Sequence, residues 1–326
     1  MLHDTNVNKA KIYKVPVDAD DPTDVSLATS WGEFSTYHTY DTSIGGPQGC
    51  ELVDSPDQSV IYSLISEQAY NNNIVKMFKH TVGSDGSVGA ATYVNTFADA
   101  GMTSVRGVSC VMFSDASNVY NGLVFICDPG NSCVRVFSLV NTTITLIASL
   151  PCGSERPMDV TAAKGNNSYV LVYASVMDVG DRADDYVQCF SGTKSGSIWT
   201  WSAGTPLIDD SSAQPDLKYL TNIAVHEFNA YPDNQLTMLT YDDVDGVGIR
   251  IFQVTLGYGG NFYQYSDNFT YRPTTAPIFT DGLGIGYADY DGGGAGEGFF
   301  YFVGDKDPNL VCRDGGPNIA VYENAS

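Results

Sequence analysis

A pattern of four short apolar segments recurs along this chain, and it limits the possible folds more than any other feature. Each copy has a segment led by Gly or Pro, a second apolar segment, a third containing Val/Ile-x-x-Phe, and a fourth rich in aromatic residues. The segments of the most regular copy are Arg106–Phe113, Gly122–Cys127, Cys133–Phe137 and Ile144–Ala148. Sets of short strands repeating every ~50 to 60 residues become stable by stacking radially. The sequence therefore predicts an all-β fold, a β-propeller.

We expect a single propeller domain over residues 1–326, with about five blades (five to six) of four strands each. The approximate blades are residues 46–104, 105–155, 156–216, 217–276 and 277–326, with residues 1–45 joining the last one. N- and C-terminal strands would then close the last blade together. One or two β-sandwiches are the alternative, because sandwiches also have short strands and frequent turns.

Two terminal segments, Ala10–Val15 and Ile319–Tyr322, compete for one place in the closing blade. Either that blade has five strands, or the ring is irregular, or one strand pairs with another molecule. An unpaired strand offers backbone donors and acceptors to a second copy. A head-to-tail contact that does not close on itself builds a filament. The terminal segments thus favour self-association, as a homo-oligomer or a filament.

The charge balance excludes several classes of partner. The chain has 38 acidic and 16 basic side chains, a formal net charge of -22, so it cannot neutralise a run of phosphates. We therefore expect neither nucleic acid nor an anionic membrane as a partner. No apolar run reaches the ~20 residues of a membrane span. The first 15 residues contain no apolar signal-peptide core, so a secreted form would be a mature fragment.

The second copy of the pattern carries a specific motif. It contains Arg106–Ser109 and then Gly122–Phe137, in which Asp128, Gly130 and Asn131 form a turn. This resembles an NHL repeat, whose core reads P-x-G-V-x-V and then L-Y-V-A-D-x-G-N-x-R-V-x-V-F. We expect Asp128 and Asn131 to bond the local backbone and Gly130 to adopt a left-handed conformation. The resemblance implies a propeller of the superfamily that includes gluconolactonase-like enzymes, although its members mostly have six blades.

The same resemblance implies a calcium ion on the propeller axis, held by oxygen ligands at the beginnings of inner strands. The acids and amides near such positions are Glu51, Asp54, Asp159, Asn222 and Asp281. No motif fixes them as a set, and solvated acids at turns are the favoured interpretation.

A second weak calcium motif is formed by Asp289, Asp291 and Glu297. It resembles the D-x-D-G-D-G loop of integrin-type propeller repeats but departs from it at Gly293. A plain glycine-rich turn is the favoured interpretation. Ca²⁺ is thus the one cofactor that the sequence suggests, and otherwise we expect none.

Sequons and cysteines favour an extracellular or cell-surface location. N-linked glycans are expected at Asn141, Asn166, Asn268 and Asn324, although an Asn-rich chain also produces such sequons by chance. Cys127 and Cys133 flank a turn, so we expect a disulfide across a hairpin; a reduced pair packed as small hydrophobes is the alternative. With seven cysteines, at least one thiol stays free or pairs with another chain.

Motifs for catalysis are weak. Only four histidines are present, no G-x-S-x-G motif accompanies them, and His226 is best interpreted as a hydrogen-bonded strand residue. Trp199, Trp201 and the Tyr258–Tyr265 segment either bind glycans or pack on the next blade, and packing is favoured. The sequence therefore predicts a non-enzymatic structural or binding protein, such as a filament subunit. A calcium-dependent lactonase or hydrolase and a lectin-like propeller are the alternatives.

Overall fold

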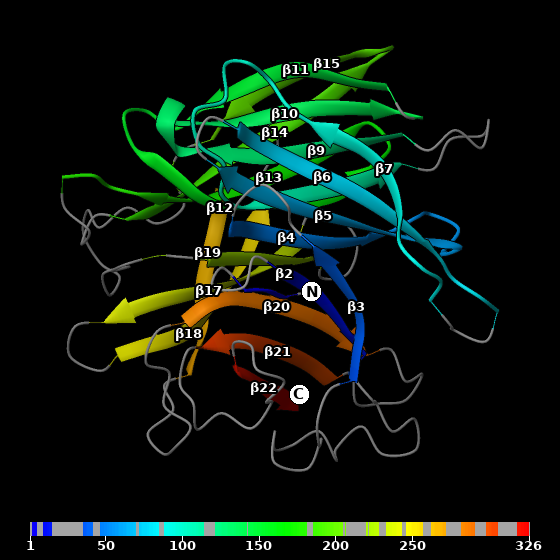
Figure 1. The fold of residues 1–326 in the computed structure, drawn as a ribbon. Helices are drawn as coiled ribbons and strands as arrows, with labels where there is room; N and C mark the ends of the chain where they lie inside the picture. Colours follow the sequence, from blue (N-terminus) through cyan, green and yellow to red (C-terminus); the bar gives the residue numbers. More distant parts are fainter. Residues whose placement is uncertain are drawn as a thin grey trace.

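Six antiparallel sheets follow one another along the chain in the computed structural model (Figure 1). The structure describes residues 2–4, 9–14, 35–41, 46–69, 72–84, 88–113, 121–141, 143–180, 185–204, 206, 220, 222–227, 233–242, 246–256, 262–271, 282–290, 298–305 and 318–325. Side chains are described for residues 48–68, 73–84, 88–113, 122–141, 143–165, 167–180, 185–204, 206, 220 and 222–225.

Four of the sheets have four strands, and we call them blades 1 to 4. Blade 1 contains β4 (Gly46–Asp54), β5 (Val60–Ala69), β6 (Asn72–Thr81) and β7 (Thr92–Phe97). Blade 2 contains β8 (Val108–Phe113), β9 (Asn121–Asp128), β10 (Cys133–Val140) and β11 (Thr143–Pro151). Blade 3 contains β12 (Arg156–Asn166), β13 (Tyr169–Met177), β14 (Tyr186–Ser195) and β15 (Ile198–Ala203). Blade 4 contains β16 (Asn222–Glu227), β17 (Asp233–Asp242), β18 (Gly246–Leu256) and β19 (Phe262–Tyr271).

The strands of a blade pair in sequence order, and the first strands of successive blades meet. β4 contacts β8, β8 contacts β12, β12 contacts β16, and β16 contacts the first strand of the C-terminal sheet. Inner strands in contact around a common axis define a propeller, so the predicted fold class is confirmed.

The terminal strands form two separate three-stranded sheets. The N-terminal sheet contains β1 (Leu2–Asp4), β2 (Lys9–Lys14) and β3 (Ser35–Asp41), and the C-terminal sheet contains β20 (Gly282–Tyr290), β21 (Gly298–Asp305) and β22 (Asn318–Ala325). β1 and β2 contact β4 of blade 1. In the part of the chain that the structure describes, no strand of one terminal sheet pairs with a strand of the other. The segments that were expected to compete for one place therefore lie in different sheets.

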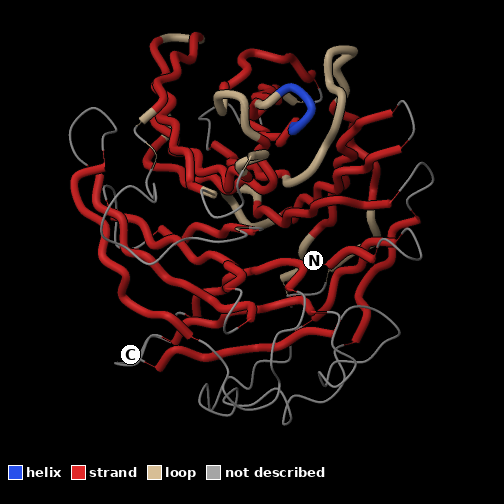
Figure 2. Tube along the Cα trace, turned by 90° about the vertical axis from the view of Figure 1, so that its left-hand side faces the viewer, coloured by secondary structure: helices blue, strands red, loops and turns tan. Residues whose placement is uncertain are grey.

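Strand content dominates the described residues (Figure 2). The helical segment there is the single 3-10 turn η2 (Pro129–Asn131), between β9 and β10. Among the described residues, a tight turn connects β14 and β15; its Gly196 has φ +62°, which a residue without Cβ adopts at no steric cost. No helix within the described ranges is long and apolar enough to cross a membrane.

The hydrophobic core lies between blades, because strands are buried on both faces. In β9, Phe125 and Cys127 belong to the cluster between blades 2 and 3, whereas Val124 and Ile126 belong to the cluster between blades 1 and 2. This alternation explains why β9 reads as one continuous apolar run.

Trp199 and Trp201 of β15 complete the interface between blades 2 and 3. Trp199 stacks on Phe113 with ring centroids 5.5 Å apart, and Trp201 meets Phe125 edge to face at 5.9 Å. Both aromatic partners lie in blade 2. The interpretation that these tryptophans pack on a neighbouring blade is therefore confirmed.

Candidate active site

Three inner strands begin with the same irregularity. The strand register shifts between Pro47 and Gly49 in β4, between Pro157 and Asp159 in β12, and between Gly282 and Gly284 in β20. A β-bulge adds one residue to a strand and changes the direction in which nearby side chains point. Two acids lie near these bulges: Asp159 ends the bulge of blade 3, and Glu51 lies two residues after Gly49, which ends the bulge of blade 1.

Asp159 is held by blades 3 and 4. Its Oδ2 accepts hydrogen bonds of 3.2 Å from Nδ2 of Asn222 and from the backbone N–H of Ile223. Its Oδ1 accepts a 3.0 Å bond from the backbone N–H of Val160. Its own backbone N–H donates to Oγ of the fully buried Ser175 at 3.0 Å. The carboxylate is therefore fixed in orientation before any ligand arrives.

Blade 2 approaches this carboxylate through backbone rather than side chain. Gly107 immediately precedes β8, and its N–H donates to the carbonyl oxygen of Met158 at 3.0 Å. A Cβ at Gly107 would overlap Oδ1 of Asp159, and a Cβ at Gly49 would lie 2.9 Å from the carbonyl oxygen of Arg106. Glycine at these positions lets the starts of β4, β8 and β12 pack backbone against backbone at the axis.

The two acids have raised and unequal pKa values. Burial, and next the negative charge of Asp159, raise the pKa of Glu51 from 4.5 to about 8, and an interaction with Ser109 of β8 offsets part of the rise. Burial raises the pKa of Asp159 from 3.8 to about 6, although its hydrogen bonds to Ile223, Asn222 and Val160 oppose the change. Both residues nevertheless keep intermediate solvent exposure. At neutral pH, Glu51 is mostly a neutral acid and Asp159 mostly an anion.

This arrangement suits general acid–base catalysis. A protonated carboxylic acid can donate a proton, and a nearby carboxylate can accept one from water. The negative charge of Asp159 raises the pKa of Glu51, so the two carboxyl groups are close enough to interact. Asp159 lies against Gly107, immediately before β8.

The other predicted axial residues do not join the pair as ligands. Asp54 lies on β4 like Glu51, but it is exposed, and its odd spacing from Glu51 directs it to the other face of the strand. Asn222 contacts Asp159, and Asp281 lies outside the described residues. Among the side chains that the structure describes, no group of three or more His, Cys, Asp or Glu residues is placed to hold a metal ion.

The second calcium motif remains a prediction. Asp289 lies in β20, without a described side chain, and Asp291 and Glu297 lie outside the described residues. The glycosylation sites also stay predictions. Asn141 is exposed at the turn between β10 and β11, with φ 56°. The remaining sequons place their asparagines in β12, β19 and β22: Asn166, Asn268 and Asn324.

The expected disulfide is not formed in the structure, where Cys127 and Cys133 are both free and buried. The hairpin was predicted correctly, but its register pairs Cys127 with Val134 and Cys133 with Asp128. Neighbouring positions on a strand point to opposite faces of the sheet. The two thiols therefore point away from each other, and the alternative of a reduced, buried pair fits the structure.

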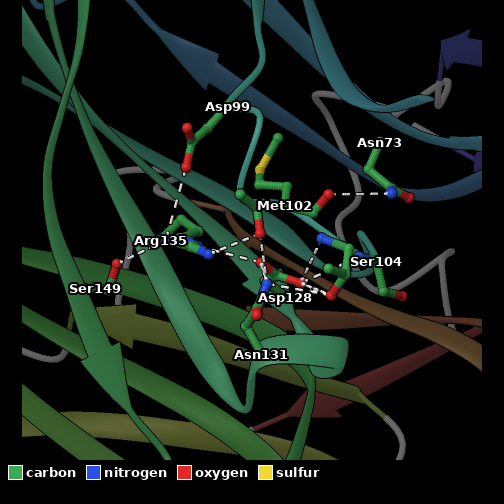
Figure 3. Close-up of polar contacts among 10 residues, drawn as sticks. Asn73, Asp99, Met102, Ser104, Asp128, Asn131, Arg135 and Ser149 are labelled. Carbon is green, nitrogen blue, oxygen red and sulfur yellow. Dashed lines mark hydrogen bonds and ion pairs between the residues drawn. The ribbon is translucent and has the colours of Figure 1, made fainter. Parts of the chain in front are cut away.

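The turn that carries the NHL-like motif forms a clasp between blades (Figure 3). Oδ1 of the fully buried Asp128 accepts hydrogen bonds from the backbone N–H groups of Thr103 and Ser104, at 3.3 and 3.1 Å. Oδ2 accepts bonds from Nδ2 of Asn131 at 2.7 Å and Nε of Arg135 at 3.1 Å. Asp128 therefore anchors the segment that leads from blade 1 into blade 2.

Two expectations about this turn need correction. Asp128 bonds a segment 24 to 25 residues away in addition to its own turn. The left-handed residue is Ser132, with φ 50°, and not Gly130. Glycine is needed at position 130 because a Cβ there would overlap Oγ1 of Thr103.

Comparisons with known proteins identify the fold of the chain, but they do not assign the chain to a sequence family. The chain matches no protein-family model and no curated protein sequence. A glycoside hydrolase family 32 β-fructofuranosidase from Bombyx mori, solved with sucrose, has a TM-score of 0.50 at 9% identity over 86% of this chain and 60% of that chain. The chain thus spans less than two thirds of that enzyme. An α-L-arabinofuranosidase from Lactobacillus brevis has a TM-score of 0.50 at 11% identity, over 85% and 89% of the two chains.

These neighbours correct the functional expectation. The propeller part of the NHL resemblance is confirmed, since both solved structures share the fold. The comparisons contradict the prediction of a non-enzymatic structural or binding protein, since both of these solved structures are named as glycosidases. Sequence reasoning named Glu51 and Asp159 as candidate axial calcium ligands and favoured solvated acids at turns, so it did not predict an acid–base pair. It missed Gly107, although glycine at the equivalent position of two repeats was a readable signal.

Proposed function

We propose that the protein is a glycoside hydrolase in which Glu51 is the general acid and Asp159 the general base. One observation carries this proposal: two partly accessible, interacting carboxyl groups near the starts of inner strands have pKa values of about 8 and about 6, and hydrogen bonds fix the orientation of Asp159. Glycosidases use such a pair, one carboxyl protonated and the other ionised, on either side of the scissile bond.

The reaction consumes one water molecule per bond. Glu51 gives its proton to the glycosidic oxygen while the bond from that oxygen to the anomeric carbon breaks. Asp159 takes a proton from water as the water oxygen bonds to the anomeric carbon. The products are two sugars with free hydroxyl groups. Proton exchange with solvent then restores the acid form of Glu51 and the anionic form of Asp159.

The fold supports this assignment without specifying the substrate. The two neighbours with a TM-score of 0.50 are named as a β-fructofuranosidase and an α-L-arabinofuranosidase. Both names describe hydrolysis at a furanose sugar. Aryl α-L-arabinofuranosides and sucrose are therefore reasonable first substrates, followed by oligosaccharides of acidic sugars.

The test is hydrolysis of this panel by the wild type, Glu51→Gln, Asp159→Asn and the control Asp54→Asn. Removing an acid or base of this kind costs about 10²- to 10⁴-fold in rate. We expect Glu51→Gln and Asp159→Asn to lose activity to that degree and to keep their circular dichroism spectra. Asp54→Asn should remain active. Equal activity of all four proteins, or no hydrolysis by the wild type, would refute the proposal.

We also propose that blade 2 is an NHL-type repeat and that the protein is extracellular. The first proposal is supported by the hydrogen bond between the motif residues Asp128 and Asn131, which gives both a structural role in this turn. The second is supported by the four sequons. Treatment of the native protein with an N-glycan-removing enzyme should lower its mass, and an unchanged mass contradicts glycosylation.

A further inference from the structure

Arg106 occupies a special position at the opening of blade 2. It precedes Gly107, as Gln48 precedes Gly49 in blade 1 and Met158 precedes Asp159 in blade 3. Its backbone carbonyl accepts a 2.6 Å hydrogen bond from Oγ of Ser66. Its guanidinium donates from Nη1 to Oε1 of Gln48. The side chain is thereby held near the axis, one residue from the backbone that packs on Asp159.

No acid neutralises this guanidinium within the described part of the chain, although the protein has 38 acidic residues. Arg135, in contrast, forms ion pairs with two acids: its side chain lies 3.1 Å from Asp128 and 3.7 Å from Asp99. Arg106 is half-buried, and burial lowers its pKa. A half-buried cation without a counter-charge costs stability. Such a cost is typical of groups that await a charged ligand.

The hydrogen bond to the neutral Gln48 leaves most of the hydrogen-bonding capacity of Arg106 unused. A guanidinium has five N–H donors in one plane, and Gln48 receives one of them. The planar fork matches the two oxygens of a carboxylate or sulfate group. The backbone of Arg106 directly precedes Gly107, which packs on Asp159, and the remaining N–H donors of its guanidinium are available to a charged group of a bound glycan.

We propose that Arg106, positioned by Gln48, binds the negatively charged group of an acidic sugar next to the bond that is cleaved. Arg106 is then a specificity-determining residue for glycans that carry carboxylate or sulfate groups. This inference rests on the proposed glycosidase function for its biological meaning, but the binding itself does not require hydrolysis. In a chain with a net charge of -22, a dedicated cation also offsets the repulsion that an anionic ligand would meet.

The test is calorimetric binding of matched oligosaccharides. The probes are an oligogalacturonide, its carboxyl-reduced form, which differs only in charge, and a sulfated form of the reduced oligosaccharide. The proteins are the wild type, Arg106→Gln, Arg106→Lys and the control Arg156→Gln, whose arginine is exposed at the start of β12. A charge-assisted, bidentate contact is worth about 10- to 100-fold in affinity.

We expect the wild type and Arg156→Gln to bind an anionic probe at least 10-fold more tightly than the reduced one. Preference for the oligogalacturonide identifies a carboxylate subsite, and preference for the sulfated probe identifies a sulfate subsite. Arg106→Gln should lose the preference and keep its affinity for the reduced form. Arg106→Lys retains the positive charge but lacks the planar fork, so it should keep part of the preference for the anionic probe. Equal binding of all probes by the wild type, or an unchanged preference in Arg106→Gln, overturns the inference.

The outcomes also separate this inference from the proposed function. Charge-selective binding that depends on Arg106, without hydrolysis of any probe, would support the subsite and refute the glycosidase assignment. Hydrolysis of neutral glycans that depends on Glu51, with no effect of Arg106→Gln on any probe, would support the glycosidase assignment and refute the subsite.

Discussion

Gly107 of blade 2 lies against Asp159 of blade 3 so closely that a Cβ on the glycine would overlap Oδ1 and lie 2.6 Å from Cα of the aspartate. The contact is between backbone and carboxylate, so neither residue can move without the other. The packing of β8 against Asp159 thus depends on a residue that has no side chain.

Substitution of this glycine should therefore impair both folding and activity. In Gly107→Ala, the methyl group must displace Asp159 or separate β8 from β12, because Val160 N also lies 2.9 Å from the Cβ position. Overpacking of this kind costs about 1–3 kcal/mol. Thermal melting and glycoside hydrolysis should both decrease. Gly180→Ala is the control, since its Cβ would meet only Oδ1 of Asp178, at 3.2 Å. Equal effects of the two substitutions would contradict the packing argument.

The raised pKa of Glu51 predicts how stability depends on pH. Its pKa is about 8 in the folded protein against an ordinary value of 4.5, so the folded state binds more protons between these limits. The free energy of unfolding contributed by Glu51 therefore falls as pH rises from about 4.5 to 8. Glu51→Gln removes this titration. Relative to wild type, the variant should gain roughly 2–4 kcal/mol in stability between pH 5 and pH 9.

Urea denaturation at several pH values measures this difference. Asp54→Asn on the same strand is the matched control and should show a much smaller gain. A variant more stable than wild type but inactive is the expected result for a group retained for catalysis. If the difference in the free energy of unfolding between Glu51→Gln and wild type stays constant with pH, the pKa of Glu51 is not raised in the folded protein.

The clasp of Asp128 should be among the most sensitive sites away from the axis. In the wild type, both oxygens of Asp128 face hydrogen-bond donors. Asp128→Asn replaces one of them with an amide NH₂ group, which is itself a donor, and Arg135 loses its buried counter-charge. We expect a loss of roughly 3 kcal/mol in the free energy of unfolding. Asn131→Ala removes an exposed residue of the same clasp and should cost about 1 kcal/mol. Equal losses in the two variants would contradict the central role of Asp128.

The cysteines of the same hairpin should be free. Cys127 and Cys133 point to opposite faces of blade 2, and burial raises the pKa of each thiol. Both should react with an alkylating reagent after denaturation without reductant, and neither should react rapidly in the native protein. Peptide mass analysis provides the readout. A cross-linked peptide containing both residues would show that the register of β9 and β10 differs from the one described.

The fold was predictable because it depends on local patterns that repeat. Recurring apolar segments such as Gly122–Cys127, together with Trp199 and Trp201, sufficed to predict strands that pack between blades. The turn at Asp128 was also predictable from its composition. Its partners Thr103 and Ser104 were not, because contacts across 24 to 25 residues depend on how two blades dock.

The site was predictable only in part. The repeats indicated where inner strands begin, and so identified Glu51 and Asp159. Their pairing depends on the packing of three blades around an axis, which no local pattern encodes. The disulfide prediction was wrong for a related reason: a register that offsets Cys127 from Cys133 by one position reverses the face of one thiol. Arg106 carried no signal in the sequence, because its lack of an acidic partner among the described residues is a property of the folded chain.

The pH dependence of kcat/KM for glycoside hydrolysis tests the assignment of Glu51 and Asp159 most directly. The base must be ionised and the acid protonated, so the rate should fall below a pKa of about 6 and above a pKa of about 8. A bell-shaped profile centred near neutral pH is the predicted result, with the upper limb lost in the residual activity of Glu51→Gln. A profile without an upper limb in the wild type, or the same profile in both proteins, would contradict the account.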